Sequence, residues 1–449
     1  MRHLLTSSAL ACALLLPSVL PAQSGTVAIR AGRILTGDTT IIDGTLLIEN
    51  GRITAVGGAD LEVPYESIMH EYPDATLFAG FAEAHTNSGM DRANEGVPIA
   101  PFLNVADSIN PVATFFEDEL RAGTVAMGVL PGNETVIGGR GRVVMPAGMT
   151  IDQMTLTGDL GMKIVISPKR GWSRSAQIAE LREAFEGLDH RLRLLGQKLV
   201  DEGTRNDILA KHDAAPDRKP DDADRWDSQA GAVRFGDDFA GKDLISEEDL
   251  SDQDRGLLAI RNGDERVWLA CATASDVVHG KKWVSDMGLL EQTVFVVTAA
   301  AWKAAAELSG AGLGVVLQGA LWHVERNPVT YKEVETFAPK VFHDAGVTFA
   351  LGSNGQLLGP NLQGYQAATC VREGVPRSVA LDAVTRVPAQ MWGLEGQIGT
   401  LTAGADGTFV LLDGDPLDVS SRVLEVWMRG IRTYDRTTDE RLQRLTEGR

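Results

Sequence analysis

Both ends of the chain carry short segments in which apolar residues follow the patterns typical of strands. Near the N-terminus these are residues 27–29, 33–35, 45–49 and 52–56, and Asn50-Gly51 favours a tight hairpin turn between the last two. Near the C-terminus residues 408–412 and 426–428 have the same strand-like pattern of apolar residues. We therefore expect strands from the two termini to pair into one small β domain.

The middle of the chain alternates between apolar strand-like runs and helical stretches. The expected strands are residues 77–84, 124–130, 163–166, 267–271, 294–298, 315–317 and 347–351, with helices such as 176–186 and 302–308 between them. This rhythm predicts the α/β class and a (β/α)8 TIM-like barrel, for which roughly 250 residues plus insertions are typical. The expected domains are a barrel over 79–395 and a flanking β-sandwich built from 25–78 and 396–449.

One acidic segment interrupts this rhythm. Residues 213–255 hold 14 Asp and Glu against 6 Lys and Arg, with weak hydrophobic periodicity, which predicts a solvated insertion. A calcium loop around Asp221, Asp222 and Asp224 is the alternative, although the twelve-residue EF-hand spacing is absent. The whole chain has 42 basic and 61 acidic residues, a net charge of −19. That balance argues against a nucleic-acid partner, because phosphate backbones are bound by clustered Lys and Arg.

The first 22 residues have the pattern of a secretory signal peptide. Arg2 precedes an apolar run, and Ala22 ends a plausible cleavage site. We expect export to the periplasm or the extracellular space, with a lipoprotein anchored through Cys12 as the alternative. No later apolar run reaches the roughly 20 residues that span a bilayer, so no transmembrane segment is expected. Export would permit a disulfide between Cys271 and Cys370, but we expect two separately buried thiols.

Several motifs together resemble one known family. Residues 31–34 and 48–57 are similar to its opening strands, residues 79–87 to the segment that carries two metal-binding histidines, and residues 399–404 and 412–417 to its closing strands. Internal landmarks at residues 135–139 and 168–170 agree with this pattern. The chain thus resembles the amidohydrolase superfamily, in particular the imidazolonepropionase-like branch, over most of its length.

The resemblance implies a metal site at the C-terminal ends of the barrel strands, where a bound water becomes the nucleophile. His85 stands at the first ligand position, but the other matching positions lack ligands: Asn87 and Ala270 stand where His is expected, Thr298 lies at or beside a third His position, and Asn354 replaces the catalytic Asp. The acidic or Lys ligand expected near Ile166 and Ser167 is also absent there. Catalytic zinc usually needs about three protein ligands. We therefore expect no bound metal and no other cofactor.

Two functional hypotheses follow. The first is an exported amidohydrolase homologue that has lost metal-dependent hydrolysis and binds a ligand or a partner, such as a small molecule, an active homologue or a second copy. Its expected pocket comprises His85, Asn87, Ser167, Thr298, His323 and Asn354. The alternative is an active hydrolase of C–N bonds in small amides, cyclic amides or dipeptides. It would need zinc or another divalent metal at an unusual site built from His85, His323 and the carboxylate of Glu83.

Overall fold

Strands from both ends of the chain form one continuous sheet. The computed structural model describes residues 25–37, 39–213, 238–353 and 363–447, so the expected signal peptide and Cys12 lie outside the described residues. The sheet has seven strands in the order β17-β16-β15-β4-β1-β2-β3. They are β1 (Val27–Leu35), β2 (Thr40–Glu49), β3 (Arg52–Gly57), β4 (Ile68–Phe78), β15 (Phe409–Leu412), β16 (Val423–Met428) and β17 (Ile431–Asp435). Asn50 and Gly51 both have positive φ, as the predicted hairpin turn requires.

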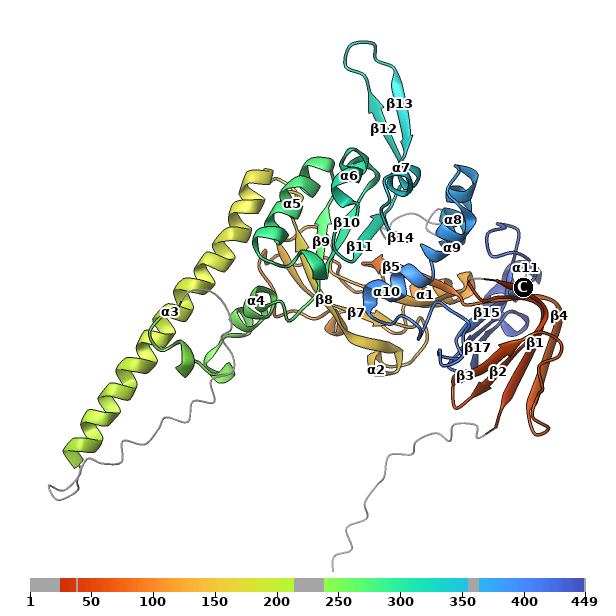
Figure 1. Ribbon diagram of the computed structural model, residues 1–449, viewed down its shortest axis with the longest axis horizontal. Coiled ribbons are helices and arrows are strands. Elements are labelled where there is room, and N and C mark those ends of the chain that lie inside the picture. The colour runs from red at the N-terminus through yellow and green to blue at the C-terminus, as the bar shows by residue number, and fades with distance from the viewer. Residues whose placement is uncertain (1–24, 38, 214–237, 354–362, 448–449) are drawn as a thin grey trace, which may run out of the picture.

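The central sheet has eight strands and forms a nearly closed barrel, which confirms the predicted fold class (Figure 1). The order is β14-β11-β10-β9-β8-β7-β6-β5. The strands are β5 (Phe81–Thr86), β6 (Thr124–Val129), β7 (Ile137–Val144), β8 (Thr155–Val165), β9 (Val267–Cys271), β10 (Thr293–Val297), β11 (Gly314–Gln318) and β14 (Phe349–Gly352).

Two details of the barrel differ from the expectation. The single strand expected over 77–84 is divided between β4 and β5, because Gly80 adopts φ 80° and turns the chain from one sheet into the other. Strand β7 runs antiparallel to both of its neighbours, whereas a (β/α)8 barrel has parallel strands throughout. Its glycines at 138, 139 and 141 lie within the strand.

Helices cover the outer face of the barrel. They are α1 (Thr114–Ala122), α2 (Ile151–Met154), α3 (Arg174–Asp213), α4 (Asp252–Asn262), α5 (Ala274–Asp286), α6 (Ala305–Leu308), α7 (Ala338–Asp344), α8 (Gln363–Arg372), α9 (Arg377–Asp382) and α10 (Arg386–Trp392), and α11 (Glu440–Glu447) ends the described chain. The helix expected over 176–186 is the first part of α3, which extends far from the barrel (Figure 1). The helix expected over 302–308 is a 3-10 turn, Ala299–Ala304, followed by the short α6.

The acidic segment is not a solvated insertion throughout. Residues 214–237, with Asp221, Asp222 and Asp224, lie outside the described residues. The segment's last part instead folds onto the protein, since Ile245 and Leu250 are buried in the main core and α4 begins at Asp252. Two apolar side chains thus anchor a stretch whose net charge predicted exposure.

Inside the barrel, two tryptophans occupy much of the interior. Trp268 on β9 and Trp392 at the end of α10 are both buried among inward-facing residues of the strands. The indole of Trp268 donates to the carbonyl of Leu160, and that of Trp392 donates to the carbonyl of Ala84. The barrel is therefore a packed core at this level, as is usual for such barrels.

The seam between the first and last barrel strands is closed by a different segment. In the described part of the chain no ladder joins β5 to β14. Instead, the turn between α9 and α10 lies across the seam, where Ala82 on β5 donates its N–H to Val384 and Leu351 on β14 donates to Ala383. One backbone N–H group on each edge strand is satisfied in this way.

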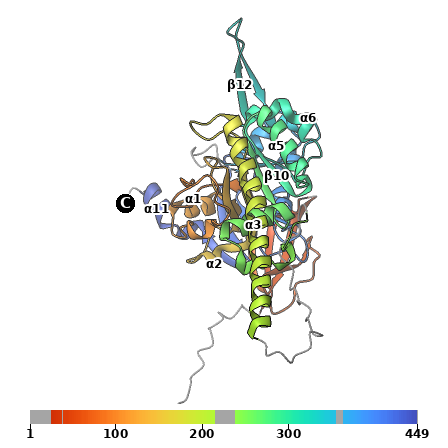
Figure 2. The same ribbon diagram turned by 90° about the vertical axis from the view of Figure 1, so that its left-hand side faces the viewer.

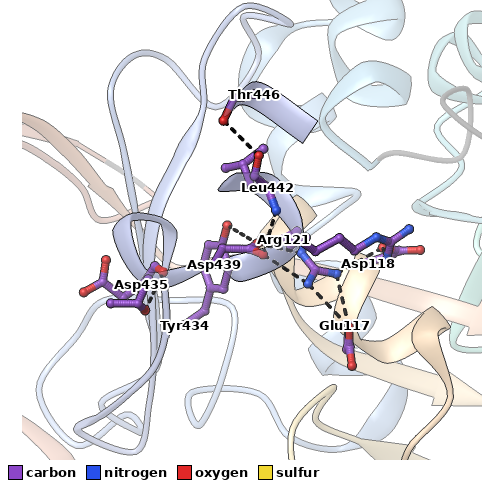
Figure 3. Close-up of polar contacts among 10 residues, drawn as sticks. Glu117, Asp118, Arg121, Tyr434, Asp435, Asp439, Leu442 and Thr446 are labelled. Atoms are coloured by element: carbon purple, nitrogen blue, oxygen red, sulfur yellow. Dashed lines mark hydrogen bonds and ion pairs between the residues drawn. The ribbon is translucent and has the colours of Figure 1, made fainter. Parts of the chain in front are cut away.

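The C-terminal segment is held against the barrel by charged groups (Figure 3). Arg121 on α1 donates to the carboxylate of Asp439, at 2.7 Å from Nε to Oδ2, and Tyr434 donates to the same oxygen. Arg121 lowers the pKa of Asp439 to about 2. Because Asp439 also accepts from the backbone N–H of Leu442, the carboxylate stabilises the start of α11.

A two-stranded hairpin projects from the barrel beyond the helices (Figures 1 and 2). It consists of β12 (Trp322–Arg326) and β13 (Glu333–Phe337), and it connects β11 to α7.

None of the helices in the described residues has both the length and the apolar character that a membrane span requires.

Candidate functional site

His85 lies at the end of β5 inside the barrel and is fully buried. Its Nε2 atom is 2.6 Å from the Nζ atom of Lys163, which comes from β8 and is also fully buried. Burial lowers the pKa of Lys163 from its ordinary value of 10.5 to about 7. Burial, with the repulsion from Lys163 whenever that amine is protonated, also lowers the pKa of His85 well below its usual value. Burial disfavours the protonated, charged form of each base, and a proton on one base repels a proton on the other.

The hydrogen bonds around His85 identify the form of this pair. Gln318 on β11 donates its Nε2 amide to the backbone carbonyl of Ser353 at 3.2 Å and accepts from Asn133 through Oε1 at 3.2 Å, which fixes the orientation of its amide. The same Nε2 lies 3.3 Å from His85 Nδ1, so Nδ1 must accept. A neutral imidazole then carries its proton on Nε2 and donates to Lys163. Lys163 is therefore a neutral amine in this arrangement.

A second buried group lies beside this network at the seam. Glu83 on β5 accepts hydrogen bonds from the backbone N–H of Ser353, at 3.0 Å, and from the Ser353 hydroxyl. Burial, with the nearby carboxylate of Glu119, raises the pKa of Glu83 to about 8. Thr86 lies 3.3 Å from the Ser353 hydroxyl. Together these side chains join β5 to the end of β14, where no backbone ladder of the described residues does so.

The remaining residues at positions that resemble family ligands have other partners. Ala270 is buried in the apolar interior cluster. Thr298 donates to the carbonyl of Ala272 at 2.7 Å and caps the following 3-10 turn. Ser167 donates to Asp276 and accepts from the N–H of Ala272, so it connects β8 to the start of α5. Asn87 follows β5 and is half-buried.

The structure does not bring the expected pocket residues together. His323 lies on the projecting strand β12, where its Nε2 is 3.6 Å from the carboxylate of Glu325. His85 and Glu83 are buried inside the barrel, so the alternative site of His85, His323 and Glu83 is not assembled. Asn354 lies outside the described residues.

Two well-formed cavities in the described part of the chain are lined by neither His85 nor Lys163. One, of about 180 Å³, lies between the loop after β5 and the residues before β7, including Asn94, Asp107 and Thr135. The other, of about 320 Å³, lies between the terminal sheet and α9 and includes Arg33 and Thr76.

The side chains at the barrel end do not fit a zinc site. Among the described residues no group of three or more His, Cys, Asp or Glu could hold a metal ion. Residues 354–362, which follow β14, contain none of these four residue types in their sequence. His85 is bonded through both ring nitrogens, and the positions of Ala270 and Thr298 supply an apolar group and an engaged hydroxyl.

The sequence did not reveal Lys163 and Gln318 as partners of His85, or Ser353 as the partner of Glu83. Lys163 lies within an apolar run and was counted only as part of a strand. A lysine between inward-facing strand residues is rarely buried without a partner, and that was the signal that could have revealed it.

Cys271 and Cys370 are free and buried, as expected, and burial raises the pKa of Cys370 to about 12.

Comparison with known proteins agrees with the resemblance to amidohydrolases that the motifs predict. The sequence is 25% identical to the amidohydrolase tasK of Hapsidospora irregularis over 424 residues, which cover 87% of this chain and 40% of that protein. The chain thus spans less than half the length of this relative. An amidohydrolase from Thermotoga maritima MSB8 has the same fold, with a TM-score of 0.70 and 19% identity over 91% of this chain and 100% of that one. No family model matches the chain.

The fold is that of a TIM-barrel protein, which it shares with the Thermotoga maritima structure. The chain is similar in sequence to an amidohydrolase and in fold to another, which confirms the predicted resemblance to amidohydrolases. The imidazolonepropionase-like branch remains a prediction from those motifs.

Proposed function

We propose that this chain is an exported amidohydrolase homologue that does not perform metal-assisted hydrolysis and instead binds a ligand or a protein partner. The observation that carries the proposal is the state of His85, whose two ring nitrogens are both engaged by Lys163 and Gln318. A histidine needs a free ring nitrogen to bind a metal ion. Here that nitrogen is used inside the protein.

The surrounding groups support the same function. Glu83, a buried carboxylate on β5, accepts two hydrogen bonds from Ser353 and links the two edge strands of the barrel. Trp268 and Trp392 occupy the interior below. The polar groups that remain from the family's site therefore stabilise the barrel, and binding falls to other surfaces of the molecule. Export rests on the pattern of residues 1–22, with its basic start, apolar run and small cleavage-site residue.

Metal content and hydrolysis, measured on the same preparation, test the proposal. The full chain is expressed with its own leader, purified without chelator, incubated with zinc or manganese, desalted and analysed by plasma mass spectrometry. We expect well under one metal ion per chain and no metal-dependent hydrolysis of N-acyl amino acids, dipeptides or cyclic amides. One zinc ion per chain that is lost in a His85→Ala variant, together with activity lost on chelation, would reject it in favour of an active hydrolase.

The location of the protein is tested separately. The mature N-terminus is sequenced from the exported fraction, and cleavage after Ala22 is expected. Retention of the intact leader in the cytoplasm would remove the export part of the proposal and leave the inactive barrel unaffected.

A further inference from the structure

The projecting hairpin exposes several apolar side chains. Val324 on β12 is 50% exposed, Val334 on β13 is 57% exposed, and Val329 and Tyr331 at the tip are 82% and 66% exposed. A two-stranded ribbon alone is at best marginally stable in water, and a group of exposed apolar residues commonly marks a contact surface. The hairpin therefore has the features of an arm that is covered in the working assembly.

The backbone of β12 has a free edge. Asn327 donates its N–H to Lys332, and Ala338 donates to Leu321 at the other end of the ribbon. Because hydrogen-bonded and non-bonded pairs alternate in an antiparallel ladder, His323 and Glu325 direct their backbone groups toward β13. The backbone groups of Trp322, Val324 and Arg326 therefore point to the outer edge, where none of the described strands pairs with them.

The side chains along this edge are complementary to themselves. Antiparallel pairing of two β12 strands about Val324 places Val324 opposite the same residue of the second copy. It also places His323 opposite Glu325, and Trp322 opposite Arg326. These are an apolar pair, an imidazole–carboxylate pair and a cation–aromatic pair, all of which favour pairing across strands. All three outward-facing residues then exchange backbone hydrogen bonds.

The other edge of the ribbon lacks this property. Pairing of two β13 strands about their central residue would place Glu335 opposite Glu335 and Glu333 opposite Phe337. Like charges directly opposite each other destabilise a pair of strands. The comparison selects β12 and a second copy of this chain as its occupant.

We propose that the protein forms a two-fold symmetric dimer through antiparallel pairing of β12 with β12 of a second copy, centred on Val324. The ribbons then form one four-stranded sheet. This isologous contact closes after two copies, since each free β12 edge is used once. The proposal is independent of whether the barrel hydrolyses a substrate.

Cysteine crosslinking at the centre of the contact gives a direct test. In a hydrogen-bonded antiparallel pair the two Cα atoms lie about 5.5 Å apart, which is within the range of a disulfide. A Val324→Cys variant of the full chain should form an intermolecular disulfide under mild oxidation at micromolar concentration. Val334→Cys, of similar exposure on the other strand, is the matched control and should stay reduced. Equal crosslinking of both variants, or of neither, would overturn the proposal.

Charge exchange tests the register. Mass by light scattering should show a dimer for the unmodified chain, and His323→Glu should weaken it at least about tenfold by placing two carboxylates opposite each other. The double variant His323→Glu with Glu325→Lys should restore the dimer, because each introduced carboxylate then faces an introduced ammonium group of the second copy. Circular dichroism confirms that each variant is folded. A monomeric parent chain, or a double variant as weak as the single one, would reject the pairing.

Discussion

Replacing Lys163 with methionine should stabilise the protein at neutral pH. The pKa of Lys163 falls from 10.5 to about 7 on folding, and each pKa unit corresponds to about 1.4 kcal/mol. Removing the proton from this buried amine therefore lowers the free energy of unfolding by about 5 kcal/mol near pH 7. The variant loses the hydrogen bond that His85 donates, which costs about 1–3 kcal/mol. The net expectation is a gain of about 2–4 kcal/mol, the difference of those two estimates.

The dependence on pH gives the sharper signal. Between about pH 7 and 10.5 the unfolded lysine holds a proton that the folded one has released, so the stability of the parent chain rises with pH over this range. The advantage of Lys163→Met should therefore shrink by about 2 kcal/mol between pH 7 and pH 9. Urea unfolding followed by tryptophan fluorescence measures it, since Trp268 lies close to His85, with ring centroids 6.4 Å apart.

The control is Lys282→Met, because Lys282 is exposed and forms its ion pair with Asp286, four residues along α5. Its effect should be below about 1 kcal/mol and should not change over the same pH range. If Lys163→Met destabilises the protein equally at pH 7 and pH 9, the neutral amine and the hydrogen-bond assignment around His85 are both wrong.

Three further predictions concern groups elsewhere in the fold. The pKa of Glu83 is about 8 in the folded protein and 4.5 in the unfolded chain, so the parent chain should lose stability as pH rises from about 4.5 to 8. The variant Glu83→Gln should not show this loss. If the free energies of unfolding of the two proteins follow the same dependence on pH, the prediction is wrong. Trp392→Ala should lower the free energy of unfolding in urea by about 3–5 kcal/mol, because it leaves a cavity in the barrel interior. The control is Trp322→Ala, since Trp322 is partly exposed. An equally small loss in both variants would show that the interior is not packed around Trp392. Asp439→Asn should increase hydrogen exchange in α11, because the ion pair with Arg121 is lost; unchanged exchange would show that this contact does not hold the helix.

Much of the fold could be predicted because local pattern and burial agree. The Asn50-Gly51 turn and the apolar runs of β9 and β10 predicted their strands almost to the residue. Strand β7 could not be recognised in this way, since its glycines have low strand propensity and its place is fixed by pairing with β6 and β8. The hairpin β12–β13 was missed because its strands are short and mostly exposed.

The site was predicted less well because its contacts join residues that are distant in the sequence. His85 was found from a motif, but its partners Lys163 and Gln318 lie 78 and 233 residues further along the chain. Nothing local distinguishes Lys163 from any other lysine in a strand. His323 was placed near the barrel end from its position after β11, whereas the chain leaves the barrel there to form the hairpin.

The joining of both sheets by late segments of the chain has a consequence for biosynthesis. Strand β4 can pair with β15 only after β15 has been synthesised, and the seam between β5 and β14 can close only after Ala383 and Val384 have been synthesised. A chain emerging from a ribosome or a translocation channel therefore presents two unfinished sheet edges until its final portion arrives, and such edges promote aggregation. Products that terminate early can complete neither sheet, so proteases and chaperones can distinguish them from finished chains by the edges they leave open.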